Sequence, residues 1–331
     1  MKWQILAGWR FILAFIVICF HLQFFISDWS DSLVAKVASF SGLAAVIGFL
    51  IISGYSIAKS ISRKPENFYR RRILRIYPLY VCSIAVSLLP FFLMGSEVVT
   101  ANRTWITPEA KIIAGNLLFL QGFAVKYIEA NLALWILSIQ IVCYILAPFL
   151  IKLNQKVLIS LTTASAILYA GYPHLYSFVF TTTDIPFPNQ WIYGIPLALF
   201  LWAWLLGLLY GLNENNKLYK LVLVSLGCLV LMINPTYVGI KGIFIYLVTS
   251  VILVADSFIK LPKKVISVAN YLGEISYPLY LFHIPAFIFA NAVLGIKNSF
   301  SLILMALLVS ITFYHTVDVP FRQKKIKRSL D

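Results

Sequence analysis

Long apolar runs separated by short polar segments dominate the pattern along this chain. Ten of them approach or exceed the roughly 20 residues that a helix needs to cross a bilayer. They cover residues 5–27, 38–58, 73–94, 132–151, 156–172, 192–212, 217–234, 239–259, 270–294 and 299–319. A further apolar stretch, 112–123, is too short to span, so we interpret it as an interfacial or re-entrant piece. The pattern predicts an all-α integral membrane protein with about ten transmembrane helices.

The basic residues fall mostly on one side of these predicted spans. Of the 27 lysines and arginines, 21 lie near the N-terminus, after the even-numbered spans or in the C-terminal tail. The remaining six are Lys36, Arg103, Lys111, Lys126, Lys241 and Lys297. Because cytoplasmic loops carry an excess of Lys and Arg, this partition predicts that both termini are cytoplasmic. A full crossing by 112–123 would invert the later loops and remove most of this bias.

The composition agrees with a membrane protein. Hydrophobic residues make up 61% of the chain and charged residues 12%, which excludes soluble globular, disordered and coiled-coil classes. Topology accounts for the net charge of +15, so nucleic acid is not an expected partner. The four cysteines lie in apolar runs without a C-x-x-C pair, which predicts buried thiols and no metal site. We interpret residues 1–331 as a single membrane domain without an appended soluble domain.

Two ionisable residues of the first predicted span need an explanation. Arg10 and His21 are 11 positions apart, about 20° past three full helical turns, so they share one face about 16 Å apart along the axis. Ionisable residues inside a membrane are costly and indicate function by default. One helix would therefore present a cation near the cytoplasmic mouth and a general base deeper in the same channel. The alternative is a snorkelling arginine and a hydrogen-bonded core histidine.

A cluster of arginines precedes the third predicted span. Arg72 and Arg75 are three positions apart and are neighbours if this segment is helical. The planar guanidinium can bind a phosphate through two hydrogen bonds, so these two residues are candidate phosphate ligands. The alternative is ordinary positive-inside charge or binding of anionic lipid, to which we assign Arg70 and Arg71.

Polar and aromatic residues also gather in two later spans. The fourth carries Trp135, Ser138, Gln140 and Tyr144. In the ninth, Tyr277, Tyr280 and His283 can share a helix face, although Pro278 and Pro285 favour kinks. We interpret His283 as a packing and hydrogen-bonding residue, and as the competitor of His21 for the role of base.

Two further polar segments lie at the predicted membrane surfaces. Asp318, near the cytoplasmic end of the last span, is expected to pair with Arg322 or His315, most simply as a structural ion pair. The segment 172–190 is expected to be an outer loop, because it has no Lys or Arg. Its aromatic residues suit the faces of carbohydrates, and equally an interfacial aromatic belt.

With these residues in view, the chain resembles the acyltransferase 3 family of integral membrane acyltransferases over nearly its whole length. The matching pieces are Arg10 and His21 as R-x10-H, Ile51–Ile57 as F-x-x-S-G-[FY]-x-I, Arg72–Pro78 as R-x-x-R-x-x-P, Ser276–His283 as S-Y-x-x-Y-L-x-H and Asp318–Pro320 as E-x-P. Many relatives carry W-S-L-x-x-E where this chain has Trp135 to Gln140, so an amide replaces the acid. Either another residue then orients His21, or Gln140 positions substrate.

The resemblance implies a function and a set of partners. Acyl-coenzyme A, most often acetyl-coenzyme A, would be the donor and co-substrate, with no permanently bound cofactor and no metal. Arg72 and Arg75 would hold its phosphates, Arg10 would meet it deeper in, and His21 would deprotonate a sugar hydroxyl or carry the acyl group. The same resemblance makes candidate substrate-binding residues of Trp135, Gln140, Tyr277 and His283. The acceptor would be an envelope polysaccharide or a lipid-linked glycan, such as lipopolysaccharide O-antigen or exopolysaccharide, modified at the bacterial inner membrane.

Two other classes of protein remain open at this point. A transporter for a glycan-related solute would show inverted repeats and broken helices in matching halves. We interpret only the ninth span as broken by proline, with no matching half. A structural scaffold in the membrane would have no need for Arg10 and His21 on one helix face. Acyl transfer by the purified protein would distinguish an enzyme from both.

Overall fold

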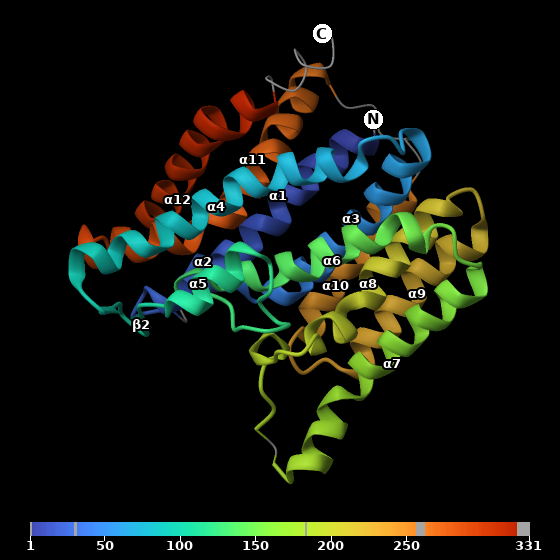
Figure 1. The fold of residues 1–331 in the computed structure, drawn as a ribbon, viewed down its shortest axis with the longest axis horizontal. Coiled ribbons are helices and arrows are strands. Elements are labelled where there is room, and N and C mark those ends of the chain that lie inside the picture. The colour runs from blue at the N-terminus through green and yellow to red at the C-terminus, as the bar shows by residue number, and fades with distance from the viewer. Residues whose placement is uncertain (1, 30–31, 183, 256–261, 323–331) are drawn as a thin grey trace.

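The computed structural model describes residues 2–29, 32–182, 184–255 and 262–322 (Figure 1). The helices are α1 Lys2–His21, α2 Leu33–Ala38, α3 Gly42–Arg63, α4 Phe68–Met94, α5 Ala110–Leu117, α6 Trp135–Leu150, α7 Gln155–Phe180, α8 Ile195–Leu212, α9 Lys217–Ile233, α10 Gly239–Val254, α11 Lys263–Ile288 and α12 Ser299–Phe313. Short 3₁₀ or π segments are η1 Leu22–Phe24, η2 Glu129–Leu134, η3 Pro188–Gln190, η4 Phe289–Val293 and η5 Tyr314–Asp318. The strands β1 Glu97–Val99 and β2 Thr104–Ile106 form an antiparallel hairpin.

A helix occupies each of the ten predicted ranges, as far as the structure describes them. Seven helical segments in the described residues are long and apolar enough to cross a membrane, and they contain α1, α3, α4, α6, α8, α11 and α12. The chain is therefore a multi-pass, predominantly helical membrane protein. The count of ten spans and the cytoplasmic side of the termini stay predictions. The end of the predicted span 239–259, and the tail bases beyond Arg322, lie outside the described residues.

Two expectations need correction, and a third, that 112–123 is too short to span, agrees with the structure. The β1–β2 hairpin is an exception to the all-α prediction. Helix α7 continues to Phe180, so the first half of the expected loop 172–190 is helical, and its end projects from the bundle (Figure 1). Helix α5 has eight residues, about 12 Å at 1.5 Å per residue, which is too short to cross a membrane. After α5 the chain folds back and buries Gln121, which donates to Leu134 O at 2.9 Å.

Small residues let α1 lie directly against α11. A Cβ atom added at Gly273 would clash with Ala7, so the two helix backbones approach closely only because glycine stands there. Helix α1 also packs on α3. This packing brings α1, with Arg10 and His21, beside the helix that carries His283.

A second close approach joins α3 to α8. A Cβ added at Gly54 would overlap the carbonyl oxygen of Trp204, and one at Gly207 would overlap the carbonyl oxygen of Ile51. Close backbone contact through glycine is typical of helix packing in membranes. The glycine of the Ser53-Gly54-Tyr55 motif therefore has a packing role. The neighbouring Ser53 lines the cavity described below.

Candidate functional site

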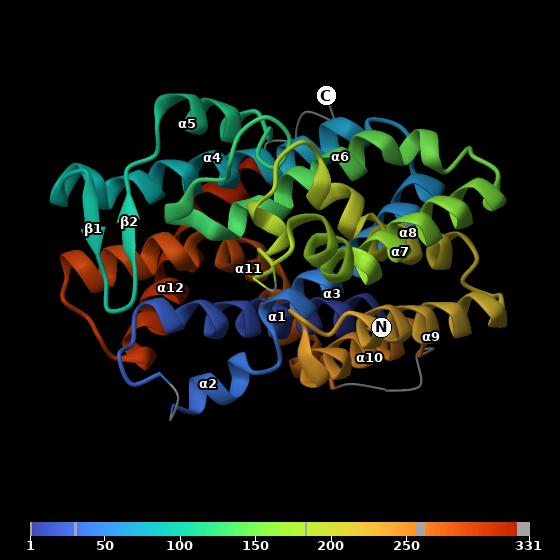
Figure 2. The ribbon, with the colours of Figure 1, turned by 90° about the horizontal axis from the view of Figure 1, so that it is seen from below.

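The candidate site extends along α1 between two ends of the bundle. We call one the arginine end, where α1 begins, α3 ends and α4 begins. The other is the hairpin end, where α1 and α4 finish beside β1 and β2. Figure 2 shows α1 and α4 running between these ends. Arg10 lies toward the arginine end and His21 at the hairpin end, as their spacing along one helix predicts.

A cavity of about 460 Å³ opens at the arginine end. The bases that line it are Arg10, Lys59, Arg63, Lys64, Arg71, Arg72 and Arg75. Among the described residues, no Asp or Glu lines it. Deeper in, its wall becomes apolar through residues such as Val46, Leu50 and Leu137. Such a cavity suits a ligand with an anionic head and a less polar arm.

Arg72 is the arginine at the start of α4 that is best positioned to bind a ligand in this cavity. Its guanidinium carbon lies 5.5 Å from the centre of the Phe68 ring and 5.7 Å from that of Tyr144. Its buried Nε has no hydrogen-bond partner in the described part of the chain. Arg71 also lines the cavity but donates to the carbonyl groups of Lys64 and Glu66. Arg70 is exposed and does not line the cavity, which agrees with its assignment as surface charge.

Gln140 belongs to this cavity and not to the surroundings of His21. Its side-chain amide donates to the hydroxyl groups of Ser53, at 3.1 Å, and Tyr144. All three residues line the cavity, as does Tyr277, whose hydroxyl donates to Ile76 O at 3.1 Å. The two alternatives for Gln140, positioning of substrate or orientation of His21 by another residue, stay predictions.

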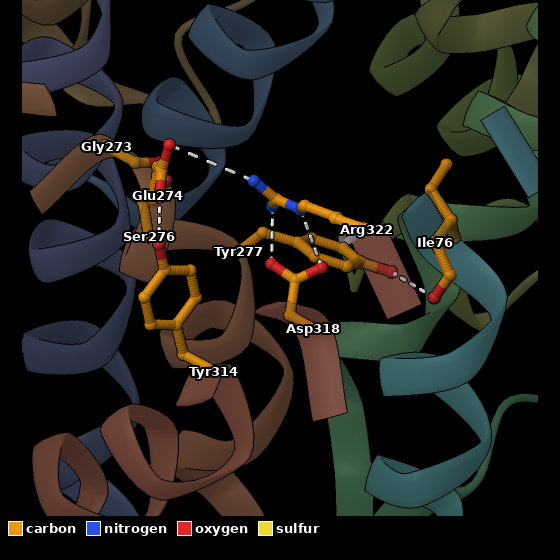
Figure 3. Close-up of polar contacts among 8 residues, drawn as sticks. All are labelled: Ile76, Gly273, Glu274, Ser276, Tyr277, Tyr314, Asp318 and Arg322. Carbon is orange, nitrogen blue, oxygen red and sulfur yellow. Dashed lines mark hydrogen bonds and ion pairs between the residues drawn. The ribbon is translucent and has the colours of Figure 1, made fainter. Parts of the chain in front are cut away.

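A second, more polar cavity of about 570 Å³ adjoins the first and shares Arg10, Arg72 and Arg75 with it. Its wall also contains Glu274 and Arg322. Figure 3 shows Arg322 bound to the carboxylate of Asp318, with Nε at 2.9 Å, and close to Glu274. The predicted pair of Asp318 and Arg322 is therefore present.

His315, the other partner considered for Asp318, lies elsewhere. Its ring is within hydrogen-bond distance of the Tyr271 hydroxyl, at 3.2 Å. The carboxylate of Glu274 accepts a hydrogen bond from Tyr314 (Figure 3). These contacts join α11 to the end of α12 beside the second cavity.

Two histidines face each other at the hairpin end. His21 Nδ1 lies 2.9 Å from His283 Nε2, and the ring centres are 5.1 Å apart. The other ring nitrogen of His283, Nδ1, lies 2.9 Å from the carbonyl oxygen of Tyr280 and 3.2 Å from that of Leu279. The His283 side chain is completely buried, whereas His21 is partly exposed. His283 is thus a hydrogen-bonding residue, as expected, and its partner is His21.

The histidines do not line the arginine cavity, although a single channel was expected to hold both Arg10 and His21. The cavity ends at Phe49 and Tyr280, whose rings meet edge to face with centres 5.8 Å apart. The Tyr280 ring is in turn 6.1 Å from the ring of His283. The Tyr280 side chain therefore lies between the cavity and the histidine pair, and Phe49 packs on its ring.

Trp135 is the candidate residue that the structure places apart from both groups. It is buried and packs on Phe187 and Phe200, and it does not line the cavity. Sequence reasoning missed Arg103 as a neighbour of the histidine pair, because its contact with Phe24 joins segments far apart in the chain. Within the described residues, no group of three or more His, Cys, Asp or Glu side chains could hold a metal ion.

Comparison with known proteins identifies the class of this chain. The family model of the acyltransferase domain Acyl_transf_3 matches residues 3–315. Acyltransferase MdmB of Streptomyces mycarofaciens is 24% identical over 162 residues, which cover 46% of this chain and 40% of that protein. The chain thus matches less than half of this relative's length. No solved structure matches it. The chain belongs to the acyltransferase 3 family.

Proposed function

We propose that this protein is a membrane-bound O-acyltransferase that uses acyl-coenzyme A. It moves an acyl group, acetyl in the simplest case, to a sugar hydroxyl of an envelope polysaccharide or lipid-linked glycan such as O-antigen. Membership of the family supports acyl transfer. The observation that carries the donor class is the arginine cavity, with its acid-free basic lining among the described residues.

The arginine cavity suits both halves of such a donor. Coenzyme A carries phosphate groups at one end and a long pantetheine arm ending in the thioester at the other. Arg72 and Arg75 offer planar guanidinium groups for phosphate, where bidentate contact is strong. The apolar inner wall around Leu50 and Leu137 suits the acyl-pantetheine arm. The thioester would then approach Tyr280, on the far side of which lies the histidine pair.

The hydrogen bonds of the pair favour one tautomer of His21. Carbonyl oxygens only accept, so His283 Nδ1 must carry the proton that it donates to Tyr280 O. In the neutral ring His283 Nε2 is then an acceptor, and His21 Nδ1 must donate to it. This leaves His21 Nε2 unprotonated, with a lone pair available to a substrate. His283 would act as a positioning residue, in the role that a carboxylate has in many histidine-based enzymes.

In the proposed reaction His21 first accepts a proton from the sugar hydroxyl and then donates it to the leaving thiolate. His21 Nε2 takes the proton of the acceptor hydroxyl while its oxygen attacks the thioester carbonyl carbon. The tetrahedral intermediate collapses, the carbon–sulfur bond breaks, and the proton passes from His21 to the leaving thiolate. The products are the acylated sugar and free coenzyme A. If His21 carries the acyl group itself, the same Nε2 attacks the thioester carbon and expels the coenzyme A thiolate. The sugar hydroxyl then attacks the acyl carbon, the bond from carbon to Nε2 breaks, and the hydroxyl proton passes to the thiolate.

The distribution of bases supports an orientation for this reaction. The arginine end would face the cytoplasm, where acyl-coenzyme A is made, and the hairpin end would face outward. The partly exposed His21 would then meet the glycan from the outer side of the inner membrane.

The donor proposal can be tested on purified protein in detergent by titration with acetyl-coenzyme A. We expect binding that Arg72→Ala weakens about ten-fold or more, since a charge-assisted hydrogen bond contributes about 1.5–3 kcal/mol. Arg70→Ala is the matched control and should bind normally. Equal losses in both variants would indicate a diffuse basic patch, and absence of binding in the wild type would contradict the proposal.

A further inference from the structure

The β1–β2 hairpin is fastened to the end of α1, directly after His21. The Asn102 side chain donates to the carbonyl oxygens of Gln23, at 2.7 Å, and Ile26, at 2.8 Å. Thr100 donates its hydroxyl to Phe24 O at 3.0 Å. Trp105, on β2, is completely buried, and its ring stacks on Phe25 with centres 5.6 Å apart. The hairpin therefore keeps a fixed position relative to His21.

Arg103, between the two strands, is held over aromatic rings. Its guanidinium carbon is 4.7 Å from the centre of the Trp105 ring and 5.2 Å from that of Phe24. The Phe24 ring also stacks on the His21 ring, with centres 6.2 Å apart. Phe24 thus contacts both the proposed base and the guanidinium group.

Glu129 completes the arrangement from another part of the chain. Its carboxylate lies 3.2 Å from the guanidinium of Arg103. It begins η2, which is tied to α11 because Asn131 donates to Leu281 O at 3.0 Å. The elements that hold both histidines therefore also hold both members of this ion pair.

The ion pair is not needed to hold the hairpin in place. Its side chains are 26% and 51% exposed, so a ligand can reach them. Exposed ion pairs contribute little to stability, because water screens them. The hairpin is already fixed by the bonds of Asn102 and Thr100 and by the burial of Trp105.

We infer that Arg103 and Glu129 form the subsite for the acceptor sugar, binding two adjacent hydroxyl groups beside His21. This inference rests on the proposed function. The guanidinium donates to hydroxyl oxygens and the carboxylate accepts from hydroxyl protons, so together they can hold a pair of neighbouring hydroxyls. The rings of Phe24 and Trp105 support the planar guanidinium from behind. A third hydroxyl of the bound sugar would then lie within reach of His21.

The test is a titration of the purified full-length protein with methyl α-glucoside and methyl α-mannoside, followed by ligand NMR in a detergent without sugar groups. We expect Arg103→Lys, which keeps the charge but loses the fork, and Glu129→Gln each to raise Kd at least about five-fold. Lys111→Ala is the matched control, since it removes another exposed ion pair, Lys111–Glu109 at 2.9 Å. This variant should bind like the wild type.

A charge exchange separates ligand binding from a structural role. The double variant Arg103→Glu, Glu129→Arg can re-form the ion pair but takes the guanidinium away from the rings of Phe24 and Trp105. The two groups then no longer match a sugar placed beside His21, so the weakened binding should persist. Recovery of binding in this variant, unchanged binding in the single variants, or no glycoside binding by the wild type would overturn the inference. Acetyl-coenzyme A titrations of the same proteins should be unchanged. The glycoside and acetyl-coenzyme A titrations are independent measurements. Absence of acetyl-coenzyme A binding by the wild type would therefore contradict the proposed function and not this inference.

Discussion

Replacing His283 by Leu removes the acceptor that fixes the tautomer of His21. In the wild type, His21 Nδ1 lies 2.9 Å from His283 Nε2 in the interior of the bundle. Leucine fills a similar volume but accepts no hydrogen bond. His21 would then keep its Nδ1 proton without a partner, or move the proton to Nε2, where it blocks the base.

The size of the effect follows from that lost partner. An unsatisfied buried donor costs about 1–3 kcal/mol, and each 1.36 kcal/mol corresponds to a factor of ten in rate. We therefore expect kcat for acetyl transfer to fall about five- to hundred-fold, so that activity remains measurable. His283→Gln supplies an amide oxygen and should lose less. Phe287→Leu, a packing change beside the His283 ring, is the matched control.

The assay is release of coenzyme A thiol in the presence of glycan at saturating acetyl-coenzyme A, with thermal unfolding measured on each protein. An orienting role predicts the order of kcat as wild type, then Gln, then Leu, at similar Tm. A Leu variant as active as the wild type would refute the reasoning. So would equal losses in the Gln and Leu variants, because packing alone would then explain them.

Three further outcomes are expected. Arg75→Ala should weaken acetyl-coenzyme A binding about ten-fold or more, and Arg75→Lys should restore it in part. Equal weakening by Arg70→Ala in the same titration would contradict a specific phosphate site. Gly54→Leu should lower the yield of folded protein in size exclusion and the Tm in thermal unfolding, because the added side chain overlaps the backbone of α8. A normal Tm would argue against the close packing of α3 on α8. A single cysteine introduced after Trp191 in a cysteine-free background should react with an impermeant reagent from outside the cell, and labelling only from the cytoplasm would contradict the predicted orientation.

The helices were predictable because the bilayer imposes a strong local rule. A crossing helix needs a long apolar run, and each run that met this condition became a helix. Their ends were less predictable, since α7 continues into the predicted loop 172–190 past Pro173, a residue type that usually ends or kinks a helix. The hairpin was missed because its strands have three residues each, too few for a recognisable alternation.

The arginine cluster and the histidine pair also differ in how far each could be predicted from the sequence. The arginine cluster at the start of α4 is local, so spacing alone suggested that Arg72 and Arg75 share a helix face. The pairing of His21 with His283 joins positions 262 residues apart and depends on how α1 packs against α11. The apolar run correctly put Arg10 and His21 on one helix, but it could not show that Tyr280 lies between the cavity and the histidines.

The most direct test of the account is acylation of surface glycan by cells that express His21→Ala at a level matched to the wild type. A positioned general base contributes about 10²–10⁴-fold to rate, and a covalent acyl carrier contributes more. We predict that mass spectrometry of the glycan detects no acylation, while the purified variant still binds acetyl-coenzyme A through Arg72 and Arg75. Acylation close to the wild-type level would contradict the proposed mechanism.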